Sequence, residues 1–226
     1  MKNSNRILRS IISTLDGNYP VKEVRCGIHW TAVNSKNCGL ASSMSWETCR
    51  REQSVKDIGS LTKKNADAMA EYSFPGNPTE ASIGVAAINS LIEVDVSRCV
   101  ELNASQYLLE KGKGENISIV GYFPFVDELK SATANLWIIE KRKEFGAEPE
   151  ESAEKFLPMS DIVAISGTTL INHTLERLLS LCRKKSIKIL LGGSTPLSPV
   201  FFDYGVDIIA GCKIIGGEHA YLYLYL

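Results

Sequence analysis

Apolar residues repeat every three or four positions at the start of the chain and later gather into short runs. The first repeat predicts an amphipathic helix whose buried face is made by Ile7, Leu8, Ile11, Ile12 and Leu15. Gly17 ends this helix. Between about Val21 and Trp46, short strand-like runs alternate with polar turns such as 34–37. This part of the pattern predicts a small antiparallel meander.

Two further helices follow the meander. The first is expected from about Thr62 to Tyr72. The second has a clear start, because Asn77 is a capping residue, Pro78 suits the first helical position and Glu80 follows three residues after the cap. Strands followed by helices are typical of α+β units. We therefore expect an N-terminal α+β domain over residues 1–102.

From residue 103 onward the pattern changes to helices alternating with short apolar runs. Such nearly continuous runs are typical of parallel strands that are covered on both faces. Five are present, at 117–121, 136–140, 162–166, 187–191 and 208–210. Between them the best helix candidate runs from Leu170 to Cys182. The pattern predicts a doubly wound, Rossmann-like α/β domain over residues 103–226.

The C-terminus departs from this rhythm. Tyr and Leu alternate from Tyr221 to Leu226, which predicts a terminal strand where the fold would call for another helix. A truncation or a sequence alteration remains an alternative explanation.

Composition excludes several classes of protein. The formal net charge of −1 offers no basic excess, which argues against a nucleic-acid partner. The six cysteines form no Cys-x-x-Cys pair, so neither a zinc ribbon nor a thioredoxin-type site is indicated. No apolar run approaches the roughly 20 residues that span a bilayer. We expect a soluble, cytoplasmic protein with reduced thiols and no membrane partner.

In open α/β sheets, ligands bind beyond the carboxyl ends of the strands, so the loops there carry the candidate chemistry. The first loop offers one glycine, Gly121, followed by Phe123 and Pro124. It lacks the glycine-rich sequence that lets backbone amides approach a pyrophosphate, which argues against bound NAD or FAD. Pro124 suits the first position of the next helix.

Glu140 closes the second predicted strand. In nucleotide-binding relatives of this fold an acid at that position accepts ribose hydroxyls. The alternative is an ordinary strand-end carboxylate, since any such unit gives this spacing.

Two later loops are rich in hydroxyl groups. Thr168 and Thr169 start a predicted helix, where they either bind a polar ligand group or merely cap the helix, and Asn172 could reach the same crevice. The stretch 192–199 combines two glycines with the hydroxyls of Ser194 and Thr195 and with two prolines, of which Pro196 is the first. Its rigidity favours a loop that is held in shape for a ligand.

Several strings together resemble a family of unknown function described as heavy-metal chelation proteins. The strings are VGYFP at 120–124, ISGTTLIN at 165–172, GGSTPLSPVFFDYGVDIIAG at 192–211 and the stretch 80–89. The resemblance implies an enolase-N-terminal-like domain packed on a Rossmann-like domain, with the pocket between them. Glu80 and His29 are then weaker site candidates on the N-terminal side.

The resemblance implies several functions. The leading hypothesis is a protein that binds a small molecule or a metal chelate, including an enzyme of condensation or hydrolysis in flavin, pterin or siderophore-like metabolism. A non-catalytic protein that holds a divalent heavy metal is the second, and an S-adenosylmethionine-dependent methyltransferase-like enzyme is the third. In the leading hypothesis Thr168, Thr169 and Thr195 hydrogen-bond polar ligand groups, and Glu140 accepts ribose-like hydroxyls or acts as an acid or base. A homo-oligomer stays open.

Overall fold

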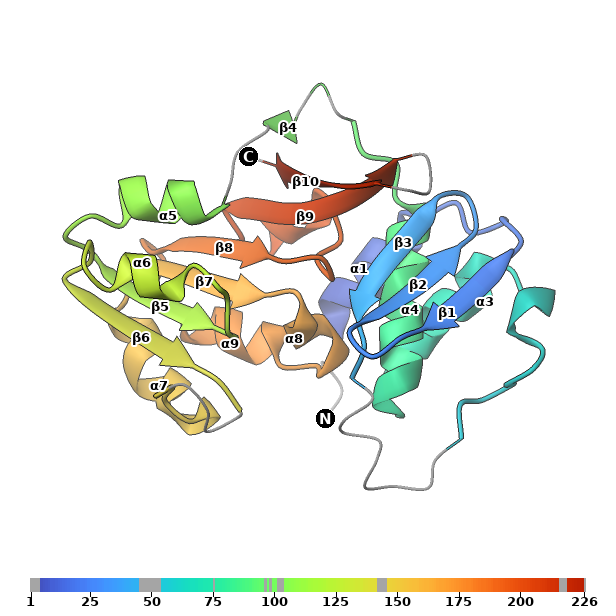
Figure 1. Cartoon of the computed structure of the whole chain (residues 1–226), viewed down its shortest axis with the longest axis horizontal. Helices are drawn as coiled ribbons and strands as arrows, with labels where there is room; N and C mark the ends of the chain where they lie inside the picture. Colours follow the sequence, from blue (N-terminus) through green and yellow to red (C-terminus); the bar gives the residue numbers. More distant parts are fainter. Residues whose placement is uncertain are drawn as a thin grey trace.

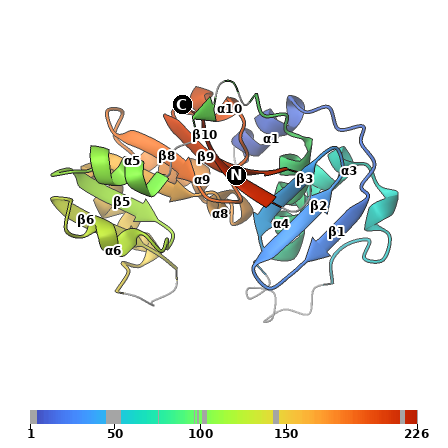
Figure 2. The ribbon, with the colours of Figure 1, turned by 45° about the horizontal axis from the view of Figure 1, so that its top comes forward.

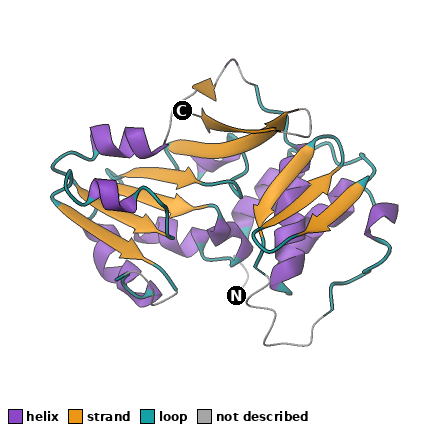
Figure 3. Cartoon of the chain, viewed as in Figure 1, coloured by secondary structure: helices purple, strands orange, loops and turns teal. Residues whose placement is uncertain are grey.

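A computed structural model describes most of the chain, namely residues 5–44, 54–74, 76–95, 97, 99–100, 104–141, 146–215 and 219–225. Two β-sheets lie side by side along the long axis of the molecule, each with its own helices (Figures 1 and 3). We call the parts that surround them the N-terminal unit and the parallel-sheet unit. No described helix has the length and apolar character needed to cross a membrane.

The N-terminal unit is built on the predicted meander. Its three strands pair antiparallel in the order β1-β2-β3, with bounds β1 Glu23–Cys26, β2 Trp30–Asn34 and β3 Cys38–Ser42. The helix α4 (Pro78–Leu91) packs against β2 and β3, and its small residues allow that close approach. Asn77 caps this helix as expected, because its side-chain oxygen accepts a hydrogen bond from the Thr79 N–H at 2.9 Å.

The other N-terminal helices are shorter than the pattern suggested. The first helix, α1, spans Arg6–Ser13. The helix expected over 62–72 is divided into a 3-10 turn η1 (Leu61–Lys63), the helix α3 (Ala66–Ala70) and a second 3-10 turn η2 (Glu71–Ser73). The end of the predicted meander, at Trp46, lies outside the described residues.

The larger sheet has seven strands in the order β4-β10-β9-β8-β7-β5-β6. Five are the predicted parallel strands: β5 Asn116–Val120, β6 Asn135–Ile139, β7 Ile162–Ser166, β8 Ile187–Leu191 and β9 Ile208–Ile215. Counted along the chain, their spatial order is second, first, third, fourth, fifth, which is a doubly wound arrangement. The α/β fold class predicted from the sequence is confirmed.

Helices cover both faces of this sheet (Figure 2). One face packs against α5 (Ala104–Lys111) and α6 (Val126–Leu129). The other packs against α7 (Ala153–Phe156), α9 (Leu175–Leu181) and α10 (Val200–Asp203), which are accompanied by the 3-10 turns η4 (Glu150–Ser152) and η5 (Leu157–Met159). This second apolar layer runs on without a break into the N-terminal unit, so the two units share a core.

The alternating C-terminal segment is a strand, as predicted. β10 (His219–Tyr225) pairs antiparallel with β9 and with the two-residue strand β4 (Cys99–Val100). This pairing explains why β9 is longer than the apolar run 208–210 indicated.

Two local predictions were wrong. The expected helix from Leu170 to Cys182 is broken into α8 (Thr168–Ile171) and α9, because the Asn172 side chain accepts hydrogen bonds from Thr174 and so competes with the helical backbone. Pro124 does not begin a helix, since α6 starts at Val126.

Candidate functional site

The strand order places a crevice at the carboxyl ends of β5 and β7. These strands are neighbours, yet the helices that follow them lie on opposite faces of the sheet, and ligands bind at such a switch point. A cavity of about 300 Å³, which we call the main cavity, occupies this position. It is lined by Ser42, Ser43, Met44, Val120, Gly121, Tyr122, Ile139, Glu140, Lys141, Glu150, Thr168, Thr169, Asn172, Thr174 and Leu178.

Backbone geometry keeps the floor of this cavity open between β5 and β7. Gly121 has φ +107°, a left-handed conformation that favours glycine, and a Cβ there would lie 2.9 Å from the Cβ of Ser166. The loop after β7 is tied down by its own hydroxyls. Thr168 Oγ1 donates to Ser166 Oγ at 2.9 Å, and Thr169 Oγ1 donates to the Ser166 carbonyl at 2.6 Å. The Thr168 oxygen therefore keeps its lone pairs for a donor group on a ligand.

Asn172 is held in one orientation at the end of α8. Its Oδ1 accepts hydrogen bonds from the Thr174 N–H at 3.2 Å and from the Thr174 hydroxyl at 2.6 Å. The amide nitrogen is thereby turned away from Thr174 and carries the donors that a ligand can use.

Charged groups enter the main cavity from the end of β6 and from η4. Glu140 Oε1 accepts a hydrogen bond from the Lys141 N–H at 2.8 Å. The Lys141 ammonium lies 3.6 Å from Glu150, which also faces Arg177 at 3.9 Å. The described residues thus contribute two carboxylates and one ammonium group to the cavity, all partly exposed to solvent.

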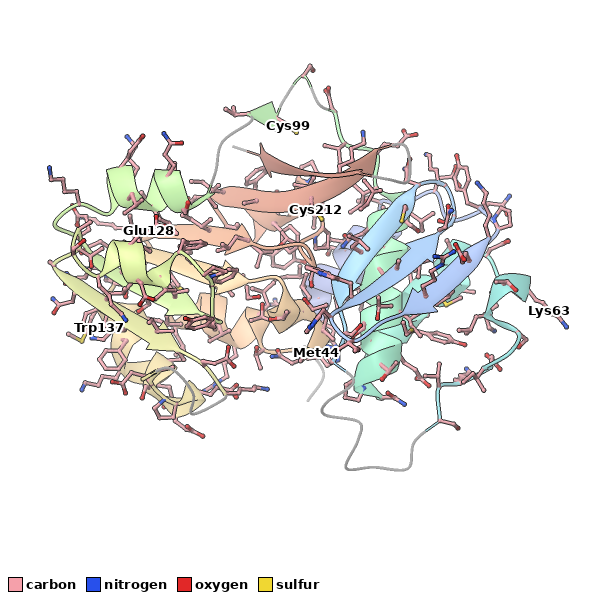
Figure 4. All side chains as sticks on the ribbon, in the orientation of Figure 1. Met44, Lys63, Cys99, Glu128, Trp137 and Cys212 are labelled. Atoms are coloured by element: carbon pink, nitrogen blue, oxygen red, sulfur yellow. The ribbon has the colours of Figure 1, made fainter. Side chains whose placement is uncertain are left out.

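The opposite wall comes from the end of β3, which sequence reasoning missed. Ser42, Ser43 and Met44 line the cavity there, and Figure 4 labels Met44 where this strand approaches α8. The Ser43 hydroxyl is 2.9 Å from that of Thr31, and the Met44 N–H donates to Ser82 Oγ at 3.3 Å. No local motif marks these residues, because only the packing of the two units brings them to the switch point.

The loop at 192–196, which we call the GGSTP loop, holds that wall in place. Ser194 is buried, and its Oγ accepts a hydrogen bond from the Ser42 N–H at 2.8 Å and lies 3.0 Å from the Ser42 hydroxyl. Asn89 Nδ2 donates to the Leu40 carbonyl at 2.7 Å and to the Ser194 carbonyl at 3.4 Å. This loop joins the edge strand of the small sheet to the parallel-sheet unit.

The predicted site residues therefore divide into two groups. Gly121, Glu140, Thr168, Thr169 and Asn172 come together around the main cavity. The others are not among its lining residues, and they are Phe123, Pro124, Ser194, Thr195, Pro196, Glu80 and His29.

The structure shows what surrounds most residues of the second group. Phe123 stacks on Phe125 with ring centroids 5.3 Å apart, against one apolar face of the sheet. Glu80 accepts a hydrogen bond from the Lys56 N–H at 2.6 Å, and His29 is an exposed residue of the turn before β2. Thr195 is buried with no hydrogen-bond partner for its hydroxyl.

The donor set of the described residues does not fit a bare heavy-metal ion. Among the described residues, no three His, Cys, Asp or Glu side chains gather where they could hold one. The main cavity offers hydroxyls, an amide, two carboxylates and the Met44 thioether, whereas soft heavy metals prefer thiolate and imidazole ligands. A metal that arrives with its own organic ligands would need only hydrogen bonds from these groups.

Fold and cavity together define a two-unit α/β protein with a ligand-sized cavity where the units meet. A family model described as "Putative heavy-metal chelation" matches residues 103–224, and a second model with the same description matches residues 8–92. The chain belongs to this family.

Related proteins support this assignment. An uncharacterized protein of Methanocaldococcus jannaschii is 30% identical over 198 residues, which cover 84% of this chain and 74% of that protein. A crystal structure of a protein of unknown function from Desulfitobacterium hafniense is 26% identical, covers 96% of each chain and has a TM-score of 0.82. A second one, from Pyrococcus horikoshii, shares the fold at 18% identity, with 97% of each chain covered and a TM-score of 0.80.

Proposed function

We propose that this protein binds a small organic molecule bearing hydroxyl or amino groups, or a metal chelate of such a molecule, in the main cavity. One observation carries the proposal: a cavity of about 300 Å³ lies at the switch point, with polar groups from both units in its walls. Small-molecule sites are typically mostly apolar clefts of roughly 300–1,000 Å³ with a few convergent polar groups. The family description suggests metal binding, and a chelate is compatible with it, because the described residues form no cluster of metal ligands.

The charges favour one chemistry for the ligand. Glu140 and Glu150 are acceptors, and ionised carboxylates form charge-assisted hydrogen bonds with hydroxyl and ammonium groups. Thr168 adds a further acceptor oxygen. A ligand rich in hydroxyl or amino groups fits this set better than a polyanion would.

The position of Glu140 favours a second candidate, a nucleoside-bearing ligand such as S-adenosylmethionine. Glu140 follows β6 and lies beside Gly121 at the end of the adjacent strand β5, where dinucleotide-binding folds place their ribose-binding acid. The loop after β5 has one glycine followed by Phe123 and Pro124, which disfavours a bound pyrophosphate. Adenosine and S-adenosylmethionine are the probes for this candidate.

The test is a set of ligand titrations of the protein, monitored by calorimetry and by NMR. The probes are myo-inositol as a polyol, Cu²⁺ alone, Cu²⁺–iminodiacetate as a neutral chelate, and the two nucleosides. We expect the polyol or the chelate to bind, whereas Cu²⁺ alone should bind without a preference for the cavity. Absence of binding by every organic probe and by the chelate up to about 10 mM, equivalent to about −2.7 kcal/mol, would overturn the proposal.

Matched variants locate the binding site. Glu140→Gln removes one carboxylate from the cavity, and the loss of a charge-assisted hydrogen bond should weaken binding by roughly tenfold or more. Glu115→Gln changes an exposed carboxylate just before the amino end of β5 and should leave binding unaltered. Equal effects of the two variants would place the ligand elsewhere.

A further inference from the structure

A second cavity of about 190 Å³ adjoins the main cavity. The two have Met44, Lys141 and Asn172 in common, so they meet at these side chains. The second cavity lies between the start of α4 and the end of α8, and it is lined by Met44, Gly76, Asn77, Pro78, Ala81, Lys141, Ile171, Asn172 and His173. We call it the second lobe.

The two lobes differ in charge. Two carboxylates, from Glu140 and Glu150, line the main cavity, whereas no acidic side chain is among the described residues that line the second lobe. Its lining instead includes the side chains of Lys141, Asn172 and His173, and the Lys141 ammonium also lies 3.6 Å from Glu150 of the main cavity. Since the Asn172 oxygen is already occupied by Thr174, its free donors are on nitrogen. The second lobe is therefore a place for hydrogen-bond acceptors and negative charge.

Two features of His173 in the second lobe are energetically unfavourable. Its φ of +61° is a left-handed conformation that non-glycine residues seldom adopt, and its Nδ1 is buried with no hydrogen-bond partner. Both features are unfavourable, and such strain gathers at functional sites. They indicate that this position serves something other than stability.

The surroundings of the ring favour its uncharged form. Burial lowers the pKa of His173 below its usual value. Behind the ring, a small void is lined by Asn5 and Glu176, and Glu176 is engaged by the Ile7 N–H at 2.9 Å and by Arg6 at 3.8 Å. On the cavity side, Lys141 is the charged residue among the described lining residues. A neutral imidazole has one N–H donor, and a nearby anion would favour the protonated form with two.

We propose that the two lobes form one site and that the second lobe binds a carboxylate group of the ligand through Lys141, Asn172 and His173. This inference rests on the proposed function and adds a substrate class: a carboxylic acid whose other end bears hydroxyl or amino groups. The hydroxyl-bearing end lies against Glu140 in the main cavity, and the acid lies in the second lobe.

Three related probes separate this inference from the proposed function. Quinate has a ring with hydroxyls and one carboxylate, myo-inositol has the hydroxyls alone, and cyclohexanecarboxylate has the carboxylate alone. Each is added to the full chain while the imidazole NMR signals of His173 are titrated with pH. A bound carboxylate should raise the pKa of His173 by about 1.

The outcomes are distinct. We expect quinate and cyclohexanecarboxylate to raise the pKa of His173, and myo-inositol to bind without doing so. If cyclohexanecarboxylate shifts the pKa of His173 while myo-inositol, both nucleosides and the chelate all fail to bind, the carboxylate site in the second lobe is supported and the proposed function is contradicted. If myo-inositol binds while neither acid changes the pKa of His173, the proposal that the second lobe binds a carboxylate is refuted, whereas the proposed function is unaffected.

Two variants check the named donors. Lys141→Gln should weaken quinate binding by roughly tenfold and myo-inositol binding by a smaller factor, because only the acid places a carboxylate at the ammonium. His173→Asn keeps a residue that tolerates a left-handed backbone, so the fold is preserved, and it should weaken quinate by roughly fivefold. Equal losses for quinate and myo-inositol in both variants would overturn the assignment.

Discussion

The contact between Ser194 and Ser42 gives a direct test of how the two units are joined. β3 is an edge strand of the small sheet, and its Ser42 N–H donates to Ser194 Oγ at 2.8 Å. Ser194 itself is 2% exposed. Ser194→Ala removes the acceptor and leaves the Ser42 N–H without its partner, while the fold around it is otherwise unchanged.

The expected loss of stability follows from the removal of a hydrogen-bond partner at the contact between the two units. An unsatisfied donor costs roughly 1–3 kcal/mol, and the lost hydroxyl contact at 3.0 Å adds to that cost. We take about 1.5 kcal/mol, because the Ser42 N–H is only partly buried. For a chain of this length that lowers Tm by roughly 3–6 °C. The variant should also weaken binding in the main cavity, because Ser42 is in its wall.

Urea unfolding and calorimetry measure the effect. The control is Ser180→Ala, an exposed serine whose hydroxyl donates to the Arg177 carbonyl within α9, and it should change stability by less than about 0.5 kcal/mol. A double-mutant cycle with Ser42→Ala should give a coupling of about 0.5–1 kcal/mol from the hydroxyl pair. If Ser194→Ala is no more destabilising than Ser180→Ala, the contact between Ser194 and Ser42 does not stabilise the junction of the two units.

Two further predictions concern stability. Gly167→Ala should cost roughly 1–3 kcal/mol in urea unfolding, since its Cβ would lie 2.5 Å from a hydroxyl oxygen of the GGSTP loop, whereas Gly76→Ala, whose nearest atoms are 3.9 Å away, should be nearly neutral. The Asn116 N–H, and then Arg183, lower the pKa of Asp161, so its contribution is present above the unfolded pKa of about 3.9 and is lost as pH falls through the lower folded value. Asp161→Asn should therefore destabilise the protein at pH 7, by about 1 kcal/mol after allowance for its partial exposure, and this difference should shrink as the pH falls below about 3.9.

The parallel sheet was predictable because each strand carries its own signal. Runs such as Ile162–Ser166 are apolar on both faces, and that pattern is specific to strands covered by helices on both sides. The helix at 170–182 was not predictable in detail. Its apolar spacing continues through Asn172, but the side-chain bonds to Thr174 interrupt the backbone there, and periodicity does not record that competition.

The candidate site was predictable on one side only. Gly121, Glu140 and Thr168 follow strands, and the carboxyl ends of parallel strands meet at one edge, so strand order alone brings them together. Ser42 and Met44 reach the same cavity from a separate sheet, through packing between residues far apart in the chain. A single sequence does not encode that approach in any local pattern.

The GGSTP loop shows how the same residues serve a different purpose from the one expected of them. Its hydroxyls and prolines indicated a rigid ligand loop, and the loop is rigidly placed, but Ser194 faces β3 and the Thr195 hydroxyl is buried. The rigid contact between this loop and β3 fixes the distance between Ser42 on one wall of the main cavity and Thr168 on the other. Substitutions in this loop should therefore change ligand affinity without touching the ligand. A loss of binding in a Ser194 variant would by itself not show that Ser194 contacts the ligand, and only the stability measured beside it separates the two roles.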